Sequence, residues 1–127
     1  MINAQAAKSA VPVNLLTAEG EYADTATATG AWTLVPAGAA SHLIIVQAVG
    51  TISTGTLIGT IESATDDQGA GGATVATFDT ITTANDAPNV QTAVLPATIG
   101  PYIRYKGTLS AGTGDIAVTM LYSPARV

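Results

Sequence analysis

The sequence of 127 residues contains no cysteine, one histidine and few charged residues. Without cysteine the chain can form neither disulfides nor thiolate metal sites, and one histidine cannot build a typical zinc site. Charged residues make up 10% of the chain, where about 25% is usual for a soluble domain. The surface must therefore be largely neutral, and a partner can cover a neutral, threonine-rich surface at modest desolvation cost.

Positive charge is also scarce, because the cations are Lys8, Arg104, Lys106 and Arg126 and the net charge is −5. Direct binding to nucleic acid draws most of its affinity from clustered Lys and Arg, and anionic membrane surfaces attract the same residues. We therefore expect neither partner. No apolar run approaches the roughly 18 residues of a membrane helix. The N-terminus lacks the pattern of a secretory signal, so the chain is expected to be made and kept in the cytosol.

Helical periodicity is absent, whereas β-patterned runs recur between turn residues. Strands are predicted at 13–16, 27–35, 42–49, 56–63, 73–81, 90–95, 102–109 and 115–122, with a turn at 50–55 and a flexible loop at 64–73. About eight short strands predict an all-β fold, a single-domain antiparallel β-sandwich or jelly roll. Residues 1–12 are predicted to form an extended N-terminal arm, and residues 13–127 the sandwich domain.

The two last strands alternate most clearly between apolar and polar positions. In 102–109 one face carries Ile103, Tyr105 and Leu109 and the other carries Tyr102, Arg104, Lys106 and Thr108; in 115–122 the apolar face carries Ile116, Val118, Met120 and Tyr122. The segment SAGTG at 110–114 is predicted to join these strands as a hairpin. The run 42–49 is apolar on both faces, which favours a central strand.

Residues typical of catalysis occur without the patterns that catalysis needs. His42 opens an apolar strand and no G-x-S-x-G motif is present, so we interpret it as a structural histidine. Asp66 and Asp67 lack the spacing of an EF-hand and indicate a solvated turn, as do Glu19, Glu21 and Asp24. The stretch GAGG at 69–72 is not followed by the Lys-Ser/Thr of a phosphate-binding loop. We expect no enzyme activity and no catalytic, cofactor or metal site.

Tyr102, Arg104 and Lys106 form a small basic and aromatic patch on one strand face. Two interpretations remain open at this point. The patch could contact an acidic surface on a partner, or it could be the ordinary polar face of a solvated strand.

Three motifs resemble those of a known group of proteins, and they follow one another along the chain in the same order. The first motif is an acidic turn with Glu62, Ser63, Asp66, Asp67 and Gly69. The second is a strand near the C-terminus with Tyr102, Ile103 and Arg104, and the third is the C-terminal segment with Pro124 and Arg126. This order resembles small structural proteins of tailed bacteriophages, which carry an ESxDG turn, a YIR or YVR strand, a Gly/Thr hairpin and a final apolar strand. The resemblance covers roughly residues 42–127, and the acidic turn is longer here than in that group.

The resemblance implies a capsid decoration, or cement, protein that is made in the host bacterial cytoplasm and lies on the outer surface of the virion. Such proteins are β-rich modules, often trimers, that clamp neighbouring copies of the major capsid protein. The expected partners are therefore the major capsid protein and two further copies of the chain in a homotrimer. The residues expected to contact partners are Ile2, Asn3, Gln5 and Lys8 in the arm, Tyr102, Arg104 and Lys106 on the late strand, and Arg126 near the end.

Two other functions share the β pattern. The first is another virion part, such as a head fibre, a tail component or a receptor-binding module. The second is a carbohydrate-binding module, which is disfavoured because such sites usually need several exposed aromatic side chains. The chain has one Trp, one Phe and four Tyr.

Overall fold

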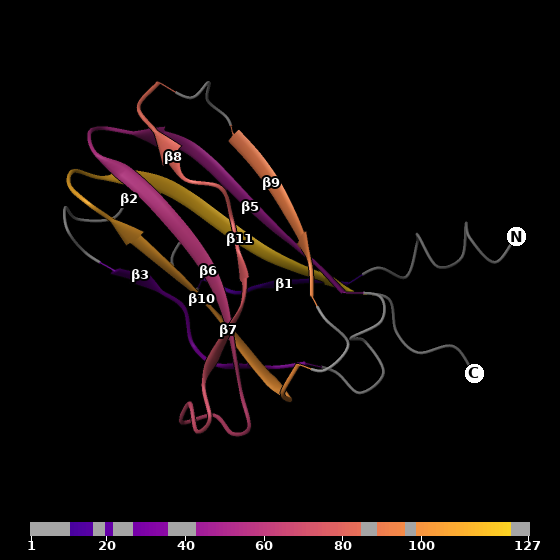
Figure 1. Ribbon diagram of the computed structural model, residues 1–127. Helices are drawn as coiled ribbons and strands as arrows, with labels where there is room; N and C mark the ends of the chain where they lie inside the picture. The colour runs from indigo at the N-terminus through magenta and orange to yellow at the C-terminus, as the bar shows by residue number, and fades with distance from the viewer. Residues whose placement is uncertain are drawn as a thin grey trace, which may run out of the picture.

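The computed structural model describes residues 11–16, 20–21, 27–35, 43–84, 89–95 and 99–122. Two antiparallel sheets pack face to face (Figure 1). Sheet A contains β1 (Val11–Asn14), β2 (Gly20–Glu21), β5 (Leu43–Ile52), β9 (Asn89–Val94) and β11 (Gly114–Tyr122). Sheet B contains β3 (Thr27–Thr29), β4 (Thr33–Leu34), β6 (Thr56–Ala64), β7 (Ala73–Thr77), β8 (Ile81–Thr82) and β10 (Tyr102–Leu109). The predicted all-β sandwich is confirmed.

The strand order is that of a jelly roll. Sheet A runs β1-β11-β5-β9 and sheet B runs β3-β10-β6-β7. Four antiparallel pairs therefore nest inside one another along the chain: β6 with β7, β5 with β9, β3 with β10, and β1 with β11. The short strands β2, β4 and β8 pair with β11, β10 and β6. Two four-stranded sheets joined in this nested order are the double Greek key of a jelly roll.

The predicted hairpin between the last two strands is wrong. β10 belongs to sheet B and β11 to sheet A, so residues 110–113 cross between the sheets. This crossing packs beside the crossing from β5 to β6: Thr113 N–H donates to Ser53 Oγ over 2.7 Å, and Thr56 N–H donates to Ser110 Oγ over 2.8 Å. Both strands have an apolar face, and those faces can meet only if the strands lie in opposing sheets.

Several element boundaries also differ from the prediction. β5 continues through Gly50, so the turn expected at 50–55 is limited to 53–55. β1 begins at Val11, so the predicted boundary between arm and domain falls inside this strand, and Glu21 lies in β2 rather than in a loop. The run predicted at 73–81 divides into β7 and β8.

The run predicted at 27–35 also divides, into β3 and β4. Residues 30–32 separate the two strands, and the Gly30 N–H donates to the Tyr105 carbonyl over 3.0 Å. A Cβ at Gly30 would collide with the Leu15 carbonyl oxygen. The chain therefore bends here where it passes close to the segment that follows β1.

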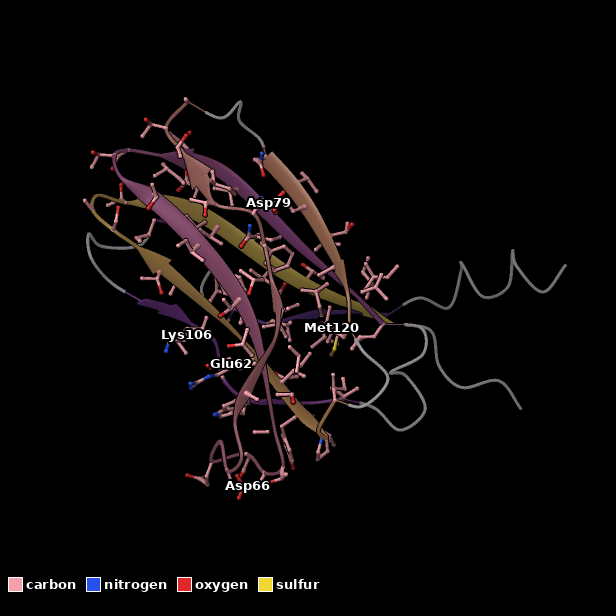
Figure 2. All side chains as sticks on the ribbon, in the orientation of Figure 1. Glu62, Asp66, Asp79, Lys106 and Met120 are labelled. Atoms are coloured by element: carbon pink, nitrogen blue, oxygen red, sulfur yellow. The ribbon has the colours of Figure 1, made fainter. Side chains whose placement is uncertain are left out.

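The core lies between the inner faces of the two sheets. Ile103, Tyr105 and Leu109 from β10 and Ile116, Val118 and Met120 from β11 are all buried, as the alternation predicted. Figure 2 shows Met120 between the sheets. β5 lies between β11 and β9, so its predicted central place is confirmed.

One polar contact crosses this core. The Tyr105 hydroxyl donates to Gln47 Oε1 over 2.6 Å, joining β10 of sheet B to β5 of sheet A. Gly59 and Gly107 face each other across β6 and β10 and leave room for the phenol ring, since a Cβ at Gly107 would lie 2.7 Å from Tyr105 Cε2. Gln47 Nε2 is buried without a hydrogen-bond partner among the described residues.

Candidate partner-binding surface

The outer face of sheet B carries Arg104 at the centre of a three-residue cluster. Arg104 Nε donates to Glu62 Oε1 over 2.7 Å, and β6 and β10 place these residues directly opposite each other. The Arg104 guanidinium carbon also lies 4.4 Å from the centre of the Trp32 ring. A guanidinium at this distance from an aromatic face is attracted by the ring quadrupole. We call Trp32, Glu62 and Arg104 the Trp32 cluster.

Trp32 also packs against the loop between β6 and β7. A Cβ at Gly69 would lie 3.1 Å from Trp32 Nε1, so only a glycine allows this approach without a shift. Gly69 also has φ +87°, a conformation that favours glycine. The loop therefore packs against the indole ring and helps to order it.

Asp66 orders the same loop from within. Its Oδ1 accepts hydrogen bonds from the Gln68 N–H over 2.9 Å and the Ala70 N–H over 3.0 Å. These donors, with Ala70 the stronger influence, lower the pKa of the Asp66 carboxyl from its ordinary value of 3.8. Figure 2 shows Asp66 at the end of the sandwich opposite to Asp79. The residue shapes a turn, as the sequence predicted, and the loop of 64–73 is hydrogen bonded within itself.

The other two residues of the predicted patch flank Arg104 on the same strand face. Tyr102 lies opposite Leu34 and Ala64, and Lys106 lies opposite Thr29 and Thr60. Figure 2 shows Lys106 on the outer side of the sandwich, away from Met120. Among the described residues Arg104 forms an ion pair with Glu62, and Lys106 forms none. Lys106 therefore keeps its charge available among neutral threonines.

The structure brings together three of the eight residues predicted to contact partners. Tyr102, Arg104 and Lys106 share one face of β10. The predicted contacts Ile2, Asn3, Gln5, Lys8 and Arg126 lie outside the described residues, as do His42, Glu19 and Asp24. The roles predicted for these residues therefore stay predictions.

The described residues hold no group of three or more His, Cys, Asp or Glu side chains that could bind a metal ion. Asp66 and Asp67 are both exposed, and Gln68 Nε2 donates to Asp67 Oδ1 over 3.4 Å. Within the same ranges no helix is long and apolar enough to cross a membrane.

Trp32 is the member of the cluster that sequence reasoning missed. The indole lies between β3 and β4, and no sequence pattern links it to Arg104, because the contact depends on the bend after β3 and on the loop at Gly69. The alternation in β10 did place Arg104 outward, and its partner Glu62 already stood in the acidic motif.

Comparison with known proteins identifies no family. No protein-family model matches the sequence, and no curated protein matches it. Among solved structures, a chain from Bacillus endospore appendages, a family of disulfide-linked pili, is similar with 16% identity and a TM-score of 0.47, over 92% of this chain and 90% of that chain. This similarity carries no functional information.

Proposed function

We propose that this protein is a structural virion protein that decorates and stabilises the capsid of a tailed phage. It binds the outer capsid surface, bridges neighbouring copies of the major capsid protein, and acts there as a homotrimer. The ordered motifs at Glu62–Gly69, Tyr102–Arg104 and Pro124–Arg126 support this proposal by resemblance.

The observation that carries the proposal is the Trp32 cluster on sheet B. Trp, Tyr and Arg are the residues that most often dominate binding energy at protein interfaces. Here Glu62 and the Gly69 loop already hold Arg104 and Trp32 in place, so a partner would not have to order them on binding. The Arg104 side chain keeps 28% of its surface exposed, and it can still donate from its terminal nitrogens to a carboxylate.

The surroundings of the cluster also suit a surface that a partner covers. Sheet B places Thr29, Thr60, Thr74 and Thr77 around it, with the exposed Leu34 and Ile58 on the same side. Neutral hydroxyls and aliphatic groups lose little on desolvation compared with Lys or Glu side chains. Lys106 adds one positive charge for an acidic partner.

A protein that binds only the assembled shell stabilises that shell by mass action. A trimer repeats each contact three times, so modest affinity at each site becomes strong through avidity. No chemistry is required of the chain, and the function depends on complementary surfaces alone.

Co-sedimentation with empty heads tests the proposal. The heads would be assembled from the major capsid protein encoded in the same genome. Wild-type protein is expected to pellet saturably with the heads and to bind unassembled capsid protein weakly. Arg104→Ala is expected to weaken binding about tenfold, since it removes a central interface residue. Thr83→Ala, at an exposed turn after β8, is the matched control and is expected to bind normally.

Failure of wild-type protein to pellet with heads would contradict the proposal. If the protein instead pelleted with purified phage tails, the alternative of a tail or receptor-binding module would be favoured. If Arg104→Ala and Thr83→Ala bound heads equally well, binding would not depend on the Trp32 cluster.

A further inference from the structure

Part of the outer face of sheet A, along β5, β9 and β11, carries no charged residue. Nine outward-facing residues of β5, β9 and β11 form it, and we call them the A face: Ile44, Val46, Ala48, Val90, Thr92, Val94, Ala117, Thr119 and Leu121. Val94 is 76% exposed, Val90 58% and Ile44 42%. Large aliphatic side chains at these exposures leave apolar area on this sheet that contact with another molecule would remove from water.

The strand register arranges the A face in three rows. One row is Val94, Ile44 and Leu121, the next is Thr92, Val46 and Thr119, and the third is Val90, Ala48 and Ala117. In each row the end residue from β9 and the end residue from β11 are alike: both are aliphatic in the first and third rows, and both are threonine in the second row. The nearest described charge along β11 is Asp115, two residues beyond Ala117, where it packs over Gly50.

We propose that the A face binds the A face of a second copy of this chain through a two-fold contact. A two-fold axis along β5 would lay β9 of one copy over β11 of the other. The aliphatic residues at the row ends of one copy would then contact aliphatic residues of the other copy. Thr92 of one copy would contact Thr119 of the other, and the two hydroxyls could form a hydrogen bond. A two-fold contact uses the same patch on both copies, so a patch with matched row ends is complementary to itself.

Charge also favours a second copy over an unrelated charged partner. Two copies of a chain with net charge −5 repel each other, and the cost is smallest where the contact itself holds no charge. An acidic or basic partner would find no residue of opposite sign on this face. The charged groups Glu62, Arg104 and Lys106 lie on the opposite sheet.

The size of the A face sets the expected strength of the contact. Three strands are about 14 Å wide and five residues about 17 Å long, which gives about 240 Å² for each copy. A stable complex buries about 600 Å² or more on each partner. We therefore expect a weak dimer that forms at high protein concentration, such as the local concentration on a crowded surface. The inference does not depend on the proposed function, because it concerns the opposite sheet.

Sedimentation velocity over a wide concentration range tests the dimer. The average mass of wild-type protein is expected to rise with concentration towards twice that of the starting species, whether this is the 12.6 kDa chain or the trimer of the proposed function. Thr92→Lys places a charge on an exposed residue of the A face and is expected to lower the association constant at least tenfold. Thr77→Lys, on the exposed edge strand β7 of sheet B, is the matched control and is expected to associate like wild type.

Cross-linking provides a second test, which reports the positions of residues in the dimer as well as the strength of association. Val46 lies at the centre of the A face, so a two-fold axis along β5 brings the two copies of this position together. The chain has no cysteine, so Val46→Cys is expected to give a covalent dimer under oxidation or with a short bismaleimide. Thr60→Cys, on the central strand β6 of sheet B, is expected to give much less.

Three results would overturn the two-fold contact. They are a mass that stays constant at every concentration, equal association of Thr92→Lys and Thr77→Lys, and equal cross-linking at positions 46 and 60. A constant trimer mass in wild type would overturn the A-face contact while supporting the trimer of the proposed function. Shell binding by a protein that stays monomeric would retain the capsid role without the A-face contact.

Discussion

At the scale of single residues, a hydrogen bond between Tyr105 and Gln47 joins the two sheets inside the core. The hydroxyl of Tyr105 reaches the Gln47 amide across the core, above the two facing glycines Gly59 and Gly107. Alternation in β10 predicted that Tyr105 points inward. It did not predict Gln47 as its partner, because a local pattern cannot identify a residue 58 positions away. The same limit applies to Trp32 and Arg104.

Tyr105→Phe is expected to lower the free energy of unfolding by about 1–3 kcal/mol, because the Gln47 amide would lose its hydroxyl donor inside the core. Chemical denaturation measures the change. Tyr102→Phe, on the outer face of the same strand, is the control and should change stability little. In a Gln47→Leu background the cost of Tyr105→Phe should shrink, and an undiminished cost would contradict the role of this hydrogen bond.

Asp66 makes the order of the Gly69 loop depend on pH. Its pKa is lowered in the folded chain, so the hydrogen-bonded carboxylate favours the folded loop above the ordinary pKa of 3.8. That contribution is lost as pH falls through the lower, folded pKa. An NMR titration should show the Ala70 amide changing with a midpoint below 3.8. Asp66→Asn should abolish this transition, and a wild-type midpoint at or above 3.8 would refute the assignment.

At the level of elements, strand positions could be predicted from the sequence and strand connections could not. The alternation in 102–109 and 115–122 gave the correct inward faces, since a period of two requires them. It could not show whether these strands are neighbours in one sheet or lie in opposing sheets, because both arrangements bury the same residues. The structure places them in opposing sheets, where the interlocking turns at Ser53 and Ser110 fix the crossing.

Val118→Asp tests the inward face of β11. Val118 is 1% exposed, so the variant would bury an unpaired charge at a cost of about 3–5 kcal/mol, a large part of the total stability of a small domain. Thr119→Asp changes the next residue, which faces outward, and should cost less than about 1 kcal/mol. Thermal unfolding of both variants measures this contrast. Equal melting temperatures would show that the face assignment is wrong.

At the level of the whole molecule, the jelly roll presents two outer faces of different character. Sheet B carries the Trp32 cluster and Lys106, whereas sheet A carries the uncharged A face. Low charge content predicted a surface that partners cover, but the division of roles between the sheets could not be predicted before the topology was known. The capsid role itself depends on the order of three motifs, since a jelly roll alone supports many functions.

The most direct test of the capsid role is the thermal stability of empty heads with and without the chain. Saturating wild-type protein is expected to raise the temperature at which the heads disassemble, because it binds the assembled lattice in preference to free subunits. Arg104→Ala at the same concentration should raise it less, and Thr83→Ala should match wild type. An unchanged disassembly temperature with saturating wild-type protein would contradict the account.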